Sequence, residues 1–423
     1  MYCIIPIFKN PNLHPLHKNN GLSALWCQVE SAKEPFFLIQ HHPDSDKMME
    51  DYYWLNDKLI LTPDKKLLNH FYKFDIVVDM NFLHWIDTGK PFDNNIRNNA
   101  IDFLSNKFYN VKKLNEIIPL SKHNEYCSDV NKVMNIPHTG ENNDYMNDVI
   151  KAFTSIEKNG IKVSDDVCDI FDIRVKKHIS NGKLYSQYNL WTTTGRPSNS
   201  FGSVNFAALP PEKRKAIVAE NDYLVEMDYD AYHLRIISYL VKYDFGKDSV
   251  HKHLAKHYEC SYEESKQRSF QLLYGGIDKQ TREKVPFFDL THKFINNKWD
   301  EINKNKYILT DIYRRRIVLE NYNDLNKSKL FNYLIQALET ELNVKKILLI
   351  QDYLLDKKTK LVLYGYDSFL FDFSKQDGVE TLKEIKRILE VKTDVPGDTE
   401  PYFYTKSKMG LNYGEIQDIT ERL

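Results

Sequence analysis

Residues 224–230 have the sequence Leu-Val-Glu-Met-Asp-Tyr-Asp, and this stretch decides the fold. An apolar run typical of a buried strand ends abruptly in carboxylates at Asp228 and Asp230. A carboxylate at the end of a rigid strand can turn its oxygens into a cleft, which suits Mg²⁺. The alternative is an aspartate that only caps the following helix, which the pattern predicts from Tyr232 to about Val241.

A second apolar stretch ends in the same way. The pattern predicts two strands, Lys360–Tyr364 and Phe369–Phe373, with Asp367 at the tip of the turn between them. Asp-Ser is ordinary turn chemistry, so this aspartate alone is not informative. As a pair, however, Asp228 and Asp367 can meet around two cations that activate a 3′-hydroxyl and stabilise a leaving pyrophosphate.

A helix predicted over Glu264–Gly275 carries Lys266, Phe270 and Tyr274 along one face, because residues four apart are neighbours on a helix. Such a stripe can grip a triphosphate and stack on a base, although a core stripe beside an exposed lysine is commoner. The turn Gly195-Arg196-Pro197 leaves Arg196 to reach a phosphate, with a merely solvated arginine as the alternative.

Composition limits the class of protein. The chain has 423 residues, of which 42% are hydrophobic, so two or three compact units are expected. Its net charge of -1 gives no overall basic footprint, so nucleic-acid binding would need a local basic cleft. The five cysteines have no CxxC spacing, which indicates a reducing compartment. Without an apolar span or a signal peptide, we expect a cytoplasmic protein that does not bind a membrane.

The order of the predicted elements gives an α+β fold class. Residues 1–135 are expected to form a separate α/β domain, followed by a linker at Ile136–Asp144. The other predicted elements are strands at Ser23–Val29, Pro35–Gln40 and Lys73–Asp79, a helix from Tyr145 to Gly160, strands at Lys183–Thr194 and Tyr223–Met227, and mainly helices over 250–345.

Taken in order, these motifs resemble those of family A (DNA polymerase I-like) DNA polymerases. TTTGRPSNSFGSVNFAALP resembles the TGRLSS…NLQNIP segment, EMDYDAYHLRI resembles motif A, KQRSFQLLYGG resembles the end of motif B, and GYDSFLFDF resembles motif C. NYLIQ resembles the NAPMQ helix, IYRRR the GRRR stretch of the fingers, and SIEKNGIKVSDD the ERNGVKID helix that precedes the thumb. The resemblance covers about 155–423 in collinear order.

The resemblance implies a right-hand polymerase fold, with a palm built on an antiparallel sheet, helical fingers and a largely missing thumb. Only Val167 to Gly182 is left for the thumb. The implied divisions are an inactive exonuclease-like or accessory domain (1–135), a helix and vestigial thumb connection (145–182), the first part of the palm (183–240), the fingers (241–335) and the second part of the palm (336–423).

The resemblance also implies an activity, that of a DNA-directed DNA polymerase, a nucleotidyltransferase of DNA replication. Asp228 and Asp367 would be the catalytic residues and the ligands of two Mg²⁺ ions, for which Mn²⁺ can substitute. Primer-template DNA and dNTPs would be its partners. The implied nucleotide-binding residues are Lys266, Phe270, Tyr274, His233 and Tyr229, and the implied DNA-binding residues are Arg196, Asn332, Gln336 and Arg315.

The sequence departs from the family pattern at three positions of the site. His233 stands where the family carries the glutamate that excludes a ribose 2′-hydroxyl, and Ser368 replaces a third carboxylate. Tyr262 stands where an arginine is expected, and Arg268 lies about 200° round the helix from Lys266 and cannot replace it. Arg314–Arg316 are then the candidate source of a grip on the triphosphate.

The N-terminal region departs as well. It offers Glu30 and Asp79 but no Asp-x-Glu, so we expect no proofreading. With the reduced thumb, this predicts low intrinsic processivity and a partner, either a processivity factor or a separate proofreading subunit. Such a trimmed enzyme is typical of a phage protein made in a bacterial host. Two alternatives stay open: a sugar-tolerant or RNA-synthesising polymerase, and a catalytically inactive nucleic-acid-binding replication subunit.

Overall fold

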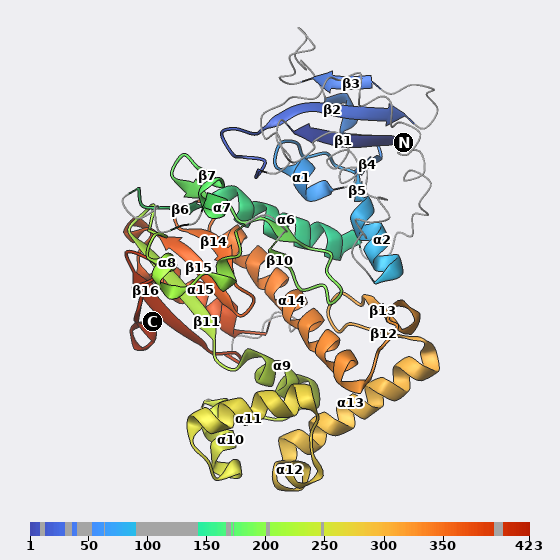
Figure 1. Cartoon of the computed structure of the whole chain (residues 1–423), viewed down its shortest axis with the longest axis vertical. Helices are drawn as coiled ribbons and strands as arrows, with labels where there is room; N and C mark the ends of the chain where they lie inside the picture. Colours follow the sequence, from blue (N-terminus) through green and yellow to red (C-terminus); the bar gives the residue numbers. More distant parts are fainter. Residues whose placement is uncertain are drawn as a thin grey trace. The chain divides into compact units, whose positions relative to one another are not determined.

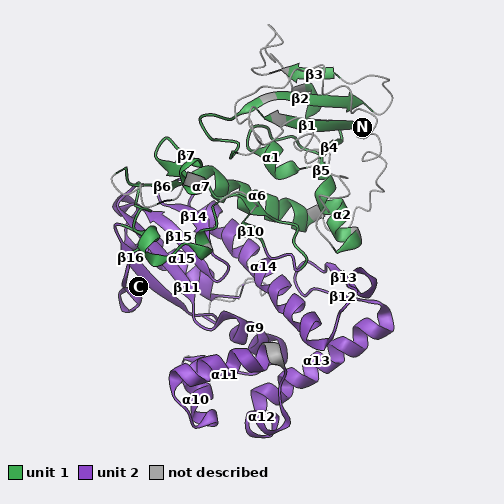
Figure 2. Ribbon diagram, viewed as in Figure 1, with its two compact units in different colours: residues 1–193, 197–220, 412–414 green, residues 194–196, 221–411, 415–423 purple. Residues whose placement is uncertain are grey.

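The structure is a computed structural model of the chain (Figure 1). It describes residues 1–8, 13–29, 36–39, 53–62, 64–89, 143–165, 171, 173–199, 204–246, 249–392 and 401–423. The chain forms two compact units, each made of separate segments (Figure 2). Unit 1 comprises residues 1–193, 197–220 and 412–414, and unit 2 comprises residues 194–196, 221–411 and 415–423.

Unit 1 contains a five-stranded mixed sheet in the described part of its N-terminal region, with the order β3-β2-β1-β4-β5. β1 is antiparallel to β2 and parallel to β4, and β4 is parallel to β5. Apolar side chains of these strands and of α1 form one core. The elements are β1 (Tyr2–Phe8), β2 (Leu22–Val29), β3 (Phe36–Ile39), η1 (Tyr53–Leu55), β4 (Ile60–Thr62), α1 (Lys65–Asn69), β5 (Val77–Asp79) and α2 (Met80–Thr88).

Helix α6 (Asn143–Asn159) packs against α1 within unit 1. The apolar side chains Val149, Phe153 and Ile156 recur at helical spacing along α6 and are fully buried, with 0% exposure. The helix ends before Gly160, which has a φ of +62° and whose Cβ would stand 2.9 Å from the Tyr185 ring, so glycine is required there. The other elements are β6 (Ile161–Lys162), α7 (Ile173–Lys176), β7 (Ile179–Ser180), β8 (Lys183–Leu184), β9 (Tyr188–Asn189), β10 (Ser198–Asn199), η3 (Phe206–Ala208) and α8 (Pro211–Arg214).

Unit 2 is built on an antiparallel sheet with the order β14-β15-β11-β16-β17. The central strand, β11, pairs with β15 on one side and β16 on the other. This register places Asp228 opposite both Ser368 and Lys406. The strands are β11 (Tyr223–Tyr229), β14 (Lys360–Tyr364), β15 (Ser368–Phe373), β16 (Thr405–Gly410) and β17 (Gln417–Asp418).

Helices make up most of the remainder of unit 2. α14 is the longest of those described, with 27 residues, and its buried positions extend over most of its length. A capping box between Ser261 and Glu264 begins α11. The elements are α9 (Tyr232–Val241), α10 (Val250–Tyr258), α11 (Tyr262–Gly275), α12 (Lys279–Lys284), α13 (Pro286–Asn305), β12 (Tyr307–Leu309), β13 (Arg316–Val318), η4 (Leu319–Asn321), α14 (Lys327–Tyr353), η5 (Lys375–Asp377), α15 (Val379–Glu390) and η6 (Thr420–Arg422).

The α+β class is confirmed, and most of the predicted elements lie within two residues of observed ones. The helix predicted from Tyr232 to Val241 coincides with α9, and the hairpin that carries Asp367 is β14–β15. β1, which carries Pro6 within an apolar run, is not among the predicted strands. The short strand β4 was not predicted either. Most of the predicted linker lies outside the described residues.

Two predicted strands need correction. Of the strand predicted over Lys73–Asp79 only β5 forms, and Ile76 just before it is 49% exposed. The strand predicted over Lys183–Thr194 is two short strands, β8 and β9, because the Tyr188 N–H at the start of β9 donates to the Glu157 carboxylate at 2.7 Å. Residues 250–345 are mainly helical, as predicted, and the short hairpin β12–β13 lies between α13 and α14.

Among the helices that the structure describes, none combines the length and the apolar character needed to cross a membrane.

Candidate active site

A cavity of about 390 Å³ lies within unit 2, where the end of β11 meets α9, α11 and the β14–β15 turn. Its wall mixes carboxylates, cations and aromatic rings from segments that are distant in the sequence. The acidic, basic and histidine side chains that line it are Arg196, Asp228, Asp230, His233, His251, Lys266, Asp367 and Lys406. Five of these eight, namely Arg196, Asp228, His233, Lys266 and Asp367, are site residues that the sequence analysis singled out.

The two predicted metal ligands are neighbours at the carboxyl end of the central strand β11. Tyr229 N–H donates to the Asp367 carbonyl at 2.9 Å, and Asp228 pairs with Ser368 in the β11–β15 ladder. Asp228 does not cap α9, because the N-cap residue is Ala231 and makes no side-chain cap. Ala231 has a left-handed φ of 53°, which turns the chain between strand and helix. The Asp228 carboxylate therefore stays at the cavity.

The electrostatics of this pair favour a bound cation. Desolvation, followed by the charges of Asp367 and Glu226, raises the pKa of Asp228 to about 7. Desolvation and the nearby Glu339 carboxylate likewise raise the pKa of Asp367. A divalent cation with oxygen ligands would relieve this crowding of negative charge, so the donor set fits Mg²⁺ or Mn²⁺.

The predicted stripe of α11 faces the same cavity. Lys266 and Phe270 line it, and Phe270 is 44% exposed rather than part of a core. The buried face of α11 is formed instead by Ser265, Ser269 and Leu272. The side chain of Tyr274 lies outside the described residues. Tyr262 also lines the cavity, so the position that lacks the family's arginine does belong to this wall.

Two basic residues of the wall, Lys406 and His251, are not among the site residues predicted from the sequence. Lys406 lies on β16, where its Nζ is 2.9 Å from Asp230 Oδ1. His251 lies on α10 and is 3% exposed. By contrast, Arg268 stacks on the Tyr258 ring at 4.6 Å and does not line the cavity. The strand Thr405–Gly410 carries lysines two residues apart, at 406 and 408, and this alternation could have indicated a basic strand face that includes Lys406.

Two further residues that the sequence patterns do not predict, Glu339 and Asn343 of α14, form hydrogen bonds with residues of the cavity wall or of adjoining segments. Glu339 bonds to Arg196 Nη2 and to His233 Nε2, both at 3.0 Å. Asn343, one helical turn later, donates to the Tyr366 carbonyl at 2.8 Å and accepts from the Tyr232 hydroxyl at 2.8 Å. One face of α14 therefore holds three separate segments of the site.

The other predicted contact residues of unit 2 lie in different surroundings. The Tyr229 ring stacks on Tyr232 at 3.9 Å, and its hydroxyl donates to the Leu389 carbonyl, so its polar end faces the core. Gln336 donates to Asn332 at 2.9 Å on half-buried turns of α14. Tyr229 lines the cavity, whereas Asn332 and Gln336 do not.

Arg315 is buried as well. It is 3% exposed, and its Nε donates to Glu341 Oε1 at 2.7 Å. A phosphate contact by Arg315 would require this ion pair to open. Neither Arg315 nor its neighbours Arg314 and Arg316 line the cavity, so their predicted role as a triphosphate grip has no support in its wall.

In unit 1, Asp79 has the environment of a helix cap. It is 1% exposed, its Oδ1 accepts from Phe82 N–H at 2.8 Å, and its Oδ2 accepts from Lys65 N–H at 2.7 Å. Burial and the neighbouring Asp64 raise its pKa to about 8. Glu30 lies outside the described residues. Both oxygens of Asp79 therefore accept backbone hydrogen bonds, while the absence of proofreading stays a prediction.

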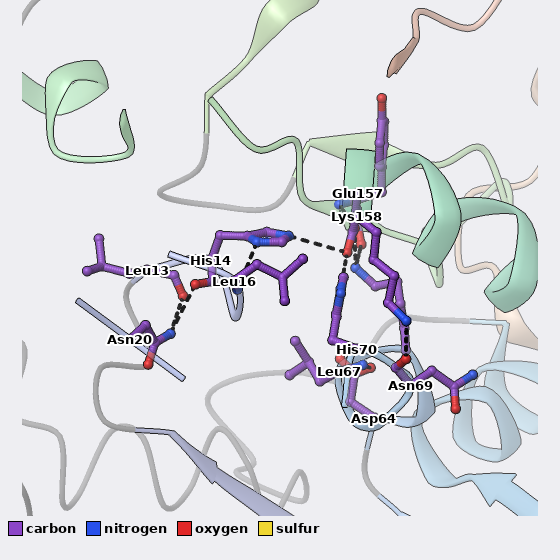
Figure 3. Close-up of polar contacts among 12 residues, drawn as sticks. Leu13, His14, Leu16, Asn20, Asp64, Leu67, Asn69, His70, Glu157 and Lys158 are labelled. Atoms are coloured by element: carbon purple, nitrogen blue, oxygen red, sulfur yellow. Dashed lines mark hydrogen bonds and ion pairs between the residues drawn. The ribbon is translucent and has the colours of Figure 1, made fainter. Parts of the chain in front are cut away.

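Unit 1 also contains a buried group of His14, His70 and Glu157, whose ligand atoms lie within 4.8 Å of one another (Figure 3). Glu157 Oε2 is 2.9 Å from His70 Nε2 and 4.0 Å from His14 Nε2. Glu157 Oε1 accepts from Lys66 Nζ at 2.5 Å and from Tyr188 N–H at 2.7 Å. The carboxylate therefore joins α1, which carries Lys66, to α6.

The hydrogen bonds of this group favour an ion-pair cluster over a metal centre. A metal-bound imidazole needs a lone pair on one nitrogen and a proton on the other, which is normally donated to an acceptor. His14 Nδ1 instead accepts from Leu16 N–H at 3.2 Å, which places the proton on Nε2. Burial lowers the pKa of His14 to about 3 and also lowers that of His70, so both rings are neutral. Lys66 already balances Glu157.

Comparison with solved structures shows what this fold is similar to. The POL domain of Pol1 from M. smegmatis, in complex with DNA primer-template and dNTP, matches with a TM-score of 0.63 and 13% sequence identity. The match covers 98% of this chain and 95% of that chain. No protein-family model matches the sequence, and no curated protein matches it. At this identity the similarity shows the fold alone, which is that of a polymerase domain.

We expect Glu157→Gln to lower the free energy of unfolding by about 3–5 kcal/mol, because it leaves the buried Lys66 charge without its partner. Chemical denaturation followed by circular dichroism would measure the loss. The double variant Lys66→Met, Glu157→Gln is the control: it removes the unpaired charge, keeps an amide oxygen for the Tyr188 N–H, and should recover part of the loss. The ion-pair interpretation fails if Glu157→Gln unfolds with the stability of the wild type.

We also expect the Mn²⁺ affinity of the cavity to rise about tenfold between pH 6 and pH 8. Metal binds the ionised form of Asp228, whose pKa of about 7 means that protons compete below neutrality and no longer compete above it. Electron paramagnetic resonance of free Mn²⁺ would give the dissociation constants. Asp228→Asn should remove the dependence, whereas Asp300→Ala, an exposed carboxylate of α13, should retain it. Equal affinities at both pH values would contradict the assignment.

Proposed function

We propose that this chain is a template-directed DNA polymerase that extends a primer with dNTPs by two-metal-ion nucleotidyl transfer. The observation that carries the proposal is the shared cavity, which brings Asp228 and Asp367 together with Lys266 and Phe270. The polymerase-domain fold and the ordered family A motifs support the same assignment. A DNA duplex and a nucleotide are held by the similar M. smegmatis domain, and we propose the same classes of partner here.

Asp228 and Asp367 would hold two Mg²⁺ ions, for which Mn²⁺ can substitute. When bound, such ions lower the pKa of a primer 3′-hydroxyl and stabilise the charge that develops on the leaving pyrophosphate. The fixed backbone geometry at the ends of β11 and β15 would keep the two carboxylates in place during the reaction. Ser368, in the position of a third carboxylate, leaves this pair as the core of the ligand set.

Other residues of the cavity wall would hold the nucleotide. Lys266 carries a positive charge toward the cavity and would bind the triphosphate, with Lys406 as a second cation. Phe270 exposes its ring and would stack near the nascent base pair, together with Tyr274. His233 would contact the sugar, while Tyr229 would support this wall from the core side.

Arg196 would hold the primer end, because it lines the cavity beside Asp367. Asn332, Gln336 and Arg315 are proposed as contacts to the duplex, the last only after its ion pair with Glu341 opens. A chain that lacks proofreading and most of a thumb would release its template often. A processivity factor or a separate proofreading subunit would then be its partner in replication, in the cytoplasm of a phage-infected cell.

Primer extension tests the proposal directly. With a labelled primer-template, Mg²⁺ and either dNTPs or rNTPs, we expect extension with dNTPs. The variant Asp228→Ala, Asp367→Ala should lose at least about a thousandfold in rate, because the metal-binding carboxylates provide several kcal/mol of transition-state stabilisation. Asp300→Ala is the matched control and should retain the wild-type rate. Product lengths under single-hit conditions would report the processivity.

The outcomes separate the alternatives. Equal use of rNTPs and dNTPs would favour the sugar-tolerant polymerase, for which the presence of His233 in the cavity wall is the supporting observation. Tight duplex binding without extension, across metals and sugars, would favour the inactive replication subunit.

A further inference from the structure

Glu339 is a fully buried carboxylate with two partners in the cavity wall. Its exposure is 0%, so the side chain depends on protein groups for its hydrogen bonds. Oε1 accepts from Arg196 Nη2 and Oε2 accepts from His233 Nε2, both at 3.0 Å. Because Arg196 and His233 both line the cavity, one buried group determines where two wall residues stand.

The contact with Glu339 fixes which ring nitrogen of His233 carries a proton and how the ring is oriented. A carboxylate oxygen can only accept, so His233 Nε2 must carry a proton, and in the neutral ring Nδ1 is the acceptor nitrogen. The ring cannot turn without breaking a charge-assisted hydrogen bond. The imidazole therefore presents one defined edge to the cavity.

Arg196 is held in a similar way. Its guanidinium bonds to Glu339 and stacks on the Tyr366 ring, 4.0 Å from the ring centroid. Tyr366 immediately precedes Asp367, and Asn343 fixes the Tyr366 carbonyl at 2.8 Å. The Glu339 carboxylate therefore positions a cation against the segment that carries the second catalytic aspartate.

We infer that Glu339 is a positioning residue for nucleotide selection: through His233 it supplies, from another helix, the carboxylate that the motif A segment lacks at position 233. The inference rests on the proposed polymerase function. It accounts for the joint presence of a histidine in the wall and a glutamate directly behind it. Without Glu339, both His233 and Arg196 would lose their orientation, and discrimination between sugars would weaken.

The chain offers a matched control in Glu341. This residue is also on α14, is also 0% exposed, and also bonds to an arginine, Arg315, at 2.7 Å. Its Oε2 accepts from the N–H groups of Ile312 and Tyr313. None of these partners lines the cavity. Removing the charge of Glu341 therefore disturbs the same helix without touching the wall.

The test measures equilibrium binding of a dNTP and of the matching rNTP to the full chain on a primer-template whose primer lacks a 3′-hydroxyl. We expect Glu339→Gln to weaken dNTP binding roughly tenfold, because a buried charge-assisted contact is lost. We expect the preference for dNTP over rNTP to fall by about the same factor. With the primer-template at saturating concentration, so that release of Arg315 toward the duplex does not enter the measurement, Glu341→Gln should lower the thermal stability similarly and leave both nucleotide-binding constants and the preference unchanged.

A double-mutant cycle identifies the route of the effect. If Glu339 acts through His233, Glu339→Gln should not change the dNTP preference further in a His233→Ala background. The inference is overturned if the two glutamine variants have the same preference, or if a wild-type chain binds no nucleotide. Failure of primer extension alone would count against the proposed function, whereas the binding ratios would still decide the role of Glu339.

Discussion

The structure of the site depends on one constraint, which is that two carboxylates are held side by side at the end of an apolar sheet. The ladder pairing of Asp228 with Ser368, and the hydrogen bond from Tyr229 N–H to Asp367, leave the pair little freedom to separate. Their mutual repulsion costs free energy, which the burial of Met227 and Phe369 on the same strands offsets. Such strain in the absence of a cation is typical of a site built to bind one.

The surroundings of the pair provide the compensation. Lys406 and Lys266 bring positive charge into the cavity from β16 and α11, while Glu339 adds a third carboxylate that is itself neutralised by Arg196. Because the partners come from helices and strands rather than long loops, their positions are set by the packing of unit 2. The long helix α14 has a central role in this packing, since Glu339 and Asn343 each join segments that the sequence separates widely.

Local sequence patterns predict the strand ends and the helix face of the site, but they do not reveal contacts between residues that are distant in the sequence. Strand ends, the helix stripe of Lys266 and Phe270, and the hairpin around Asp367 are encoded by neighbours in the sequence. Glu339 meets His233 across 106 positions, so no local period reveals it. Glu339 and Glu341 are both buried glutamates of α14, but residues two apart on a helix point about 200° apart, so they contact different regions. The sequence alone does not tell which of the two faces the cavity wall.

The contrast between Asp79 and Asp228 shows what decides the fate of a strand-end aspartate. Both follow apolar strand residues, and both precede a helix. After Asp79 the helix begins at once with Met80, so the carboxylate is drawn onto the Phe82 N–H and is consumed as a cap. After Asp228 the chain continues for three residues to the left-handed Ala231 before α9 begins, which removes the carboxylate from the helix end. The spacing between strand end and helix start, rather than the aspartate itself, therefore separates a capping residue from a candidate metal ligand.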